Sequence, residues 1–181
     1  MTVVVADRPP REHIEPGCDL VDGVLVERNV GGLASFYAGA LRDFLGPFVR
    51  RARLGVVLDA SGGGYQYPGL DGGRLRIPDL SFIRRDRLQD GLPARGWTPY
   101  APDLVVEAIS PNDLADDVHH KVQVWLDAGV PLVWVLYPDA HQVVAHHPDR
   151  TAQTYSVGDT LTAGDVVPGF AVAIADIFAA P

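Results

Sequence analysis

Two apolar segments separated by an amphipathic stretch constrain the fold of this chain more than any other feature. Residues 102–110 (PDLVVEAIS) and 131–138 (PLVWVLYP) are largely hydrophobic on both faces of an extended chain, which is typical of strands inside a sheet. Between them, residues 114–128 are predicted to form a helix, with Asp113 as its N-cap and Gly129 as its stop. Its apolar stripe consists of Val118, Val122, Trp125 and Leu126. The order strand, helix, strand predicts an α/β domain.

The rest of the chain adds a long helix and further strands. Apolar residues recur at i, i+3, i+4 and i+7 over residues 33–48, which predicts an amphipathic helix with one buried face that ends near Gly46-Pro47. Asp22-Gly23 is a turn dipeptide between two short β-rich runs, which predicts a hairpin. Further strands are predicted at 54–60, 74–85, 142–147 and 153–157. The whole pattern favours a mixed β-sheet flanked by α-helices.

Composition limits the class of protein. The chain has 181 residues, of which 47% are hydrophobic, so we expect one globular domain at 18–181 after a polar, proline-containing segment at 1–17. No apolar run approaches the roughly 20 residues that cross a bilayer, and the N-terminus does not resemble a signal peptide. Cys18 is the single cysteine, which excludes an internal disulfide and suits a reducing compartment. These features predict a cytoplasmic protein that does not enter the membrane.

Two carboxylates lie within predicted strands. Asp79 follows Pro78 in the strand predicted at 74–85, and Glu107 lies inside the apolar run at 102–110. A carboxylate in such a strand is costly to bury unless it is paired or binds a cation. Both acids are predicted to lie near the C-terminal ends of their strands, where open α/β sheets usually place their sites. If the two strands are neighbours, both carboxylates can reach one hard cation, and Mg²⁺ or Mn²⁺ suits such ligands.

Lys121 lies next to the apolar stripe of the predicted helix at 114–128. It comes three residues before Val124 and four before Trp125, so apolar side chains flank it. A lysine in this position either extends along its aliphatic stem to water or points at buried carboxylates. The helix directly follows the strand that carries Glu107, which makes the second arrangement geometrically easy. We therefore count Lys121 with the two acids as a candidate catalytic group.

Several stretches of the sequence together resemble a known family. They are DLVDG, RIPDLSFI, APDLVVEAISP, KVQVWLDAGVPLVWVLYP and LTAGDVVPGFAVAIADIF, and they extend over residues 19–178. In order and spacing they resemble the restriction-endonuclease-like proteins common among bacterial hypothetical proteins, within the PD-(D/E)XK nuclease superfamily. The resemblance implies a mixed sheet flanked by helices in a single domain, with the acids on adjacent strands. It also implies a metal-dependent endonuclease that hydrolyses DNA phosphodiester bonds.

The resemblance also assigns residues to roles. Asp79 matches the aspartate of the PD motif and Glu107 the acid of the (D/E)XK motif, with the carbonyl of Ala108 as a third metal ligand. The superfamily lysine usually lies two residues after that acid, where this chain has Ile109. Members of the family resemble one another in placing a lysine on the following helix instead, and Lys121 fits that position. It would orient the attacking water or stabilise the negative charge of the transition state.

Two further residues are weaker candidates. Asp19 occupies the position where many members of the family have a glutamate before the hairpin. His120 precedes Lys121 and is a candidate for substrate contact. The histidine that the family often carries in its first helix is missing from GGLASFYAGALRDFL. Related nucleases often pair to cut two strands, so a homodimer is also compatible with the resemblance.

The net charge of −8 is opposite to the basic surface expected of a protein that binds nucleic acid. A local basic strip can still bind phosphates. Arginines cluster in two places: Arg50, Arg51 and Arg53, and then Arg74, Arg76, Arg84, Arg85 and Arg87. The acidic charge and the missing lysine at position 109 leave a second interpretation open, a catalytically inactive nuclease fold that serves as a binding module. A metal-dependent hydrolase of small phosphoesters is a third.

Other conspicuous residues have simpler interpretations. Asp103 is four residues before Glu107 on one strand, roughly 13 Å away, so we expect it to cap the strand instead of sharing a cation. The glycine-rich run at 61–69 lacks the Lys-Ser/Thr of a phosphate loop and is interpreted as a hairpin loop. The adjacent histidines at 119–120 and 146–147 diverge too much for zinc chelation by one pair. Trp125 and Trp134 fit core positions, and Trp97 is the better candidate for an exposed contact.

Overall fold

A six-stranded mixed sheet organises the molecule. The computed structural model describes residues 18–21, 24–27, 31–88, 91–111 and 113–179, with the backbone alone for the first two segments. The strand order in the sheet is β3-β4-β5-β6-β7-β8. Only β5 and β6 are parallel, and the other neighbours are antiparallel. The strands are β3 (Gly55–Asp59), β4 (Leu80–Arg84), β5 (Leu104–Ala108), β6 (Val133–Tyr137), β7 (Gln142–His146) and β8 (Ala152–Tyr155). The predicted mixed sheet is confirmed.

The strand–helix–strand unit predicted from the apolar pattern is present. Helix α2 (Ala115–Asp127) connects β5 to β6, and its predicted stripe is buried. Gly129 ends it with a φ of +93°, and the N–H of Val130 donates to the carbonyl of Trp125 at 3.1 Å. The predicted N-cap is wrong, because the Asp113 carboxylate accepts from the N–H of Ser110 at 2.8 Å and closes the preceding turn. Leu114 occupies the cap position instead, without a side-chain hydrogen bond.

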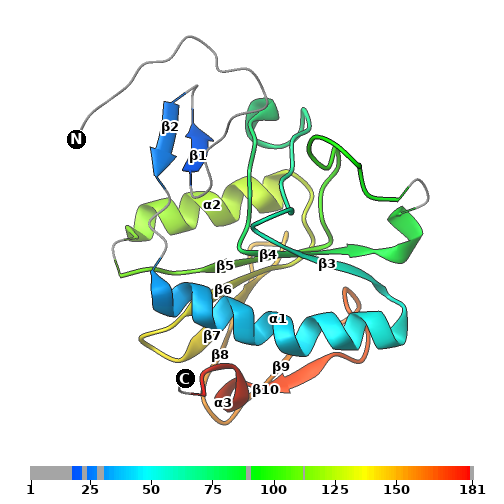
Figure 1. The fold of residues 1–181 in the computed structure, drawn as a ribbon. Helices are drawn as coiled ribbons and strands as arrows, with labels where there is room; N and C mark the ends of the chain where they lie inside the picture. Colours follow the sequence, from blue (N-terminus) through cyan, green and yellow to red (C-terminus); the bar gives the residue numbers. More distant parts are fainter. Residues whose placement is uncertain (1–17, 22–23, 28–30, 89–90, 112, 180–181) are drawn as a thin grey trace.

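Helix α1 (Gly32–Ala52) covers the other face of the sheet and is longer than predicted (Figure 1). It continues through Pro47, because the buried side chains of Leu45 and Val49 hold the last turns on the core. The missing N–H of Pro47 costs one intrahelical hydrogen bond, which this packing outweighs. Arg53, in the left-handed conformation, ends the helix. The buried face of this helix also contains fewer residues than predicted, because Leu33, Phe36 and Phe44 are each about two-fifths exposed.

The remaining elements add to both sides of the sheet. The hairpin predicted around Asp22-Gly23 is confirmed in backbone outline by the antiparallel pairing of β1 (Cys18–Val21) with β2 (Val24–Glu27), although the turn lies outside the described residues. Strands β9 (Thr160–Thr162) and β10 (Ala171–Ala173) form a second ribbon, which leads into α3 (Ile174–Ile177) beside α1 (Figure 1). The short 3₁₀ helices η1 (Asp71–Gly73) and η2 (Arg85–Arg87) flank β4. In the described part of the chain, no helix is long and apolar enough to span a membrane.

Alternation along the strands divides the core into two layers. Leu80 and Phe82 of β4 pack in the cluster with α1, whereas Ile83 packs in the cluster with α2. In β5, Val106 faces α1 and Val105 faces α2. Successive side chains of a strand point to opposite faces, so Asp79 and Glu107 belong to the face that α2 covers.

Gly55 allows β3 to approach β4 closely. A Cβ atom at this position would lie 2.0 Å from the carbonyl oxygen of Ile83 and 2.8 Å from the ring of Phe82. We expect Gly55→Ala to destabilise the protein by about 3 kcal/mol, because backbone and a buried ring must both move. Urea unfolding followed by circular dichroism measures the change. The matched Gly62→Ala variant adds a methyl group to open space and should change stability by less than about 0.5 kcal/mol. Equal stabilities of the two variants would contradict this packing.

Candidate active site

The register of β4 and β5 brings the two predicted acids side by side. Leu80 is paired with Val106, and the strands are antiparallel, so Asp79 lies opposite Glu107. The expectation that both acids lie at C-terminal strand ends is wrong for Asp79, which directly precedes β4. The start of β4 and the end of β5 meet because the two strands run in opposite directions. The two carboxylates are therefore neighbours for a different reason than the one predicted.

A backbone hydrogen bond fixes Asp79 to β5. The N–H of Ala108 donates to Oδ2 of Asp79 at 2.7 Å, a length typical of a bond to a carboxylate. In a β-strand the N–H and C=O of one residue point toward the same neighbouring strand. The carbonyl of Ala108 therefore points to the edge of β5 that faces Asp79. Two carboxylates and one backbone carbonyl therefore belong to the same end of β4 and β5.

Glu107 is held from the opposite side by α2. The indole nitrogen of Trp125 donates to Oε1 of Glu107 at 2.8 Å, and Trp125 is only 2% exposed. Trp125 was predicted to be a packing residue, which its burial confirms, but its contact with Glu107 was not predicted. The available signal was its spacing of one helical turn from Lys121 on a helix that follows the Glu107 strand. Trp125 therefore positions this carboxylate in addition to filling the core.

Lys121 lies one turn before Trp125 on α2 and is half-buried. In the part of the chain that the structure describes, no ion pair or hydrogen bond joins Lys121 to another residue. It is nonetheless the single lysine of the chain, placed on the helix that contacts Glu107. His120, the adjacent weaker candidate, is exposed. The backbone of Asp19 lies in β1 opposite Val26, and its side chain lies outside the described residues.

The donor set fits a hard divalent cation. Carboxylate and carbonyl oxygens are the ligands that Mg²⁺ prefers, and it usually keeps several waters and a substrate phosphate as well. Each carboxylate has two oxygens with about four lone-pair sites, so it can accept several partners at once. Among the described residues, no three His, Cys, Asp or Glu side chains gather into a metal cluster. A cation here would therefore depend on Asp79, Glu107 and the Ala108 carbonyl together.

The residues interpreted as structural behave as such. Asp103 is 7% exposed and accepts from the N–H of Arg84 at 2.9 Å and the guanidinium of Arg87 at 3.1 Å, so it anchors the start of β5. His146 is half-buried, and this burial, then the nearby His119 and His147, lowers its pKa. His146 lies on β7, and its lowered pKa favours the neutral imidazole.

The predicted basic strip around Asp79 is largely neutralised within the described residues. The ion pairs are Arg74 and Arg76 with Asp71, Arg84 with Asp86, and Arg87 with Asp103. Arginines engaged in this way shape the loops around β4, and less positive charge remains for phosphate binding than the sequence indicated. Charge near the site therefore depends more on Lys121 than on these arginines.

Trp125→Phe tests whether the indole positions Glu107. Loss of a hydrogen bond to a carboxylate should lower stability by about 2 kcal/mol and should also weaken Mn²⁺ binding, measured by calorimetry. Trp134→Phe is the matched control, because Trp134 is fully buried and its indole nitrogen has no hydrogen-bond partner among the described residues. The control should leave Mn²⁺ affinity unchanged. Equal metal affinity in both variants and the wild type would contradict the positioning role.

Comparisons with known proteins agree with this fold. The Uma2 family profile, described as "Putative restriction endonuclease", matches residues 7–175. A solved structure with a similar fold is described as a "putative nuclease belonging to DUF820 from Anabaena variabilis". The two chains are 18% identical, the match covers 91% of each, and the TM-score is 0.77. No curated protein matches the chain. The likeness to the solved structure supports the restriction-endonuclease-like fold.

Proposed function

The chain belongs to the Uma2 family of restriction-endonuclease-like proteins, and on that premise we propose that it is a Mg²⁺-dependent endonuclease that hydrolyses DNA phosphodiester bonds. The observation that carries the proposal is the pairing of Asp79 with Glu107 at one end of β4 and β5, with the Ala108 N–H bonded to Asp79. Asp79 and Glu107 are both half-buried, so each carboxylate loses part of its water and the two charges repel each other. A cation at this position would offset that cost.

The residues of the site have distinct tasks in this proposal. Asp79, Glu107 and the carbonyl of Ala108 would hold Mg²⁺, which supplies a water of lowered pKa and polarises a phosphoryl oxygen. The Ala108 N–H keeps the Asp79 carboxylate directed at β5, and Trp125 keeps the Glu107 carboxylate directed at α2. Both carboxylates are thus oriented before substrate binds, which reduces the reorganisation required during reaction.

Lys121 supplies the positive charge in this mechanism. Attack of water on phosphorus places additional negative charge on the phosphoryl oxygens, and a cation close to them stabilises the transition state. Lys121 lies on the same helix face as Trp125, which touches Glu107. Its ammonium can reach past the metal ligands because the side chain is long and flexible. We assign Lys121 to charge stabilisation or to orientation of the attacking water.

The direct test is plasmid cleavage by the full chain. Purified protein is incubated with supercoiled DNA in Mg²⁺, in Mn²⁺ and in excess chelator, and nicked and linear products are separated on a gel. We expect cleavage with either metal and none with chelator. The Asp139→Asn variant, which changes an exposed aspartate in the turn after β6, should retain wild-type activity. Absence of cleavage by the wild type in both metals would overturn the proposal and favour the inactive binding module.

A further inference from the structure

A second layer of backbone covers the α2 face of the sheet next to the candidate active site. Tyr65 and Arg76 exchange backbone hydrogen bonds of 2.8 and 3.0 Å, and Thr98 bonds to the backbone on either side of Tyr65. The Tyr65 side chain points inward, because its hydroxyl donates to Ser81 at 2.7 Å and its ring lies 5.9 Å from that of Trp125. Its neighbour Gln66 therefore points outward, since side chains alternate in extended backbone.

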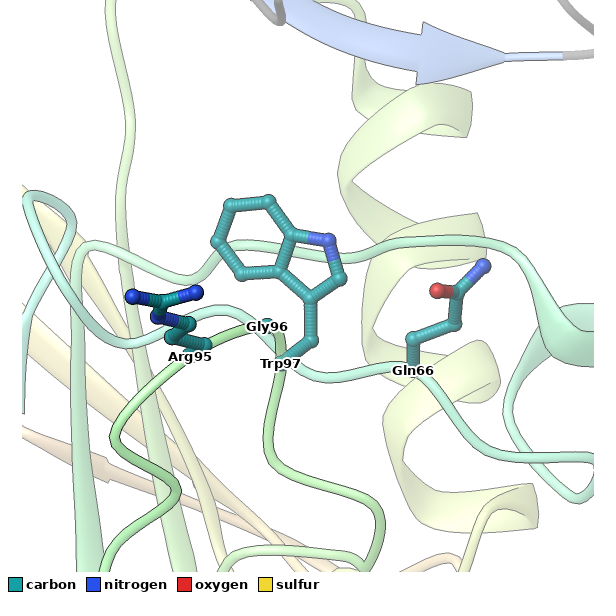
Figure 2. Close-up of a pocket in the computed structure, with 4 residues that line it drawn as sticks. All are labelled: Gln66, Arg95, Gly96 and Trp97. Atoms are coloured by element: carbon teal, nitrogen blue, oxygen red, sulfur yellow. The ribbon is translucent and has the colours of Figure 1, made fainter. Parts of the chain in front are cut away.

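The outer side of this layer carries a pocket. Its volume is about 420 Å³, and its lining consists of Gln66, Arg95, Gly96 and Trp97. Figure 2 shows the indole of Trp97 between the guanidinium of Arg95 and the amide of Gln66. The volume falls within the range of roughly 300–1,000 Å³ typical of small-ligand sites. The lining combines a flat aromatic ring, a cation and an amide.

Trp97 is held as a fixed platform. A Cβ atom at Gly64 would lie 2.2 Å from Cε3 of Trp97, so the ring lies directly against the backbone of Gly64. Trp97 is partly exposed, whereas Trp125 and Trp134 are 2% and 0% exposed. An indole with one region packed on backbone and another open to solvent is suited to stacking on a planar group. The site loses little entropy on binding, because the ring is already immobilised.

The two polar groups complement a nucleotide. The Gln66 Nε2 donates to the carbonyl of Gly73 at 3.0 Å, which fixes the amide and directs its Oε1 elsewhere as an acceptor. The Arg95 side chain is exposed, and no acidic side chain of the described residues pairs with it. Arginine is the preferred residue for phosphate contact, and amides hydrogen-bond to the edges of bases. One ring to stack on, one acceptor and one cation match a base with its phosphate.

We propose that this pocket binds an unpaired base of the nucleic-acid substrate, with Trp97 stacking on the base, Gln66 hydrogen-bonding to its edge and Arg95 contacting the adjacent phosphate. The inference rests on the proposed nuclease function for its class of substrate. The pocket and the acids Asp79 and Glu107 lie on the α2 face of the sheet, connected through Tyr65 and Trp125. In this proposal, a strand anchored by one base in the pocket places its neighbouring nucleotides toward the acids.

Fluorescence of the full chain in excess chelator tests the pocket without any cleavage. The probes are an oligothymidylate of about six nucleotides and an abasic strand of equal length, which has the phosphates but no bases. Trp97 is partly exposed and the other two tryptophans are buried, so binding of the oligothymidylate should quench mainly the emission of Trp97. The abasic strand should bind roughly tenfold more weakly, because it cannot stack. Trp97→Phe should lose the quenching but retain binding, measured by anisotropy of a labelled strand.

The variants separate stacking from phosphate contact. Trp97→Ala should weaken oligothymidylate binding roughly tenfold and leave the abasic strand unaffected. Arg95→Ala should weaken both strands and reduce the salt dependence of binding. Arg150→Ala, which changes an exposed arginine after β7, is the matched control and should bind as the wild type. Equal affinity of the wild type for both strands, or no effect of Trp97→Ala, would overturn the inference. Plasmid cleavage without base-dependent binding refutes the pocket alone, and base-dependent binding without cleavage refutes the proposed nuclease alone.

Discussion

Asp79→Asn is expected to lower Mg²⁺-dependent plasmid cleavage by about 10³-fold, the largest effect of any single substitution in this chain. The substitution removes the negative charge that a cation requires while keeping the shape of the side chain. The amide oxygen can still accept from the Ala108 N–H, which now bonds to Asp79 at 2.7 Å, so the fold should persist. Initial rates of plasmid nicking over a range of Mg²⁺ concentrations give the measurement.

Two companion variants distinguish loss of a ligand from loss of folding. Glu107→Gln should cause a similar loss of cleavage, because it removes the second carboxylate of the site. Asp103→Asn should instead lower stability by about 1–3 kcal/mol, because a buried acceptor for Arg87 is weakened, with cleavage retained where the protein is folded. Wild-type cleavage rates for both Asp79→Asn and Glu107→Gln in Mg²⁺ would show that the acids do not form the catalytic centre.

Lys121→Met is expected to lower cleavage by about 10²–10³-fold, the largest effect outside the two acids. Methionine preserves the unbranched side chain and helix propensity and removes the charge. Since Lys121 is assigned to the transition state and not to the metal, Mn²⁺ affinity and thermal stability should stay at wild-type values. The measurement pairs cleavage rates at saturating metal with calorimetric titration of Mn²⁺. Normal cleavage by this variant would show that Lys121 takes no part in catalysis.

The single lysine offers an independent check. Among the amines of the protein, acetylation can modify only Lys121 and the α-amino group, because the chain contains no other lysine. Acetylation removes the charge of the side chain. We expect acetylated wild type to lose cleavage to the same extent as Lys121→Met. The Lys121→Arg variant, which keeps the charge and resists acetylation, should lose none of its cleavage activity on treatment. Loss of activity in that variant would assign the effect to an acetylated group other than Lys121.

The sequence predicts the fold best where a strand is apolar on both faces, because such a strand fits only inside a sheet. The apolar runs of β5 and β6 and the stripe of α2 predicted a strand–helix–strand unit, and the structure contains it. Local signals failed where tertiary packing competed with them. Pro47 indicated a helix end, but buried Leu45 and Val49 keep α1 helical to Ala52. Asp113 indicated a cap, but a tighter turn with Ser110 uses its carboxylate.

The sequence indicated which residues are candidates for the site, but it did not indicate how they are arranged. Asp79 and Glu107 are carboxylates within apolar segments of the sequence. Burying a charged group costs free energy, so such residues can be recognised as site candidates from the sequence alone. Their adjacency depends on the antiparallel register of β4 with β5, which a sequence does not encode locally. The spacing of Trp125 from Lys121 indicated its helix face, but the direction of its N–H toward Glu107 depends on how α2 packs on the folded sheet. The pairing of the arginines with aspartates likewise arises only from the folded loops.

Calorimetric titration of Mn²⁺ into the full chain tests most directly whether Asp79 and Glu107 form one cation site. We expect a single binding event per chain in the wild type, which is lost in Asp79→Asn and in Glu107→Gln and retained in Asp139→Asn. The two carboxylates act on one ion, so the double variant should bind no more weakly than either single variant. Mn²⁺ binding of wild-type strength in both single variants, or no binding in the wild type, would contradict a cation site shared by Asp79 and Glu107.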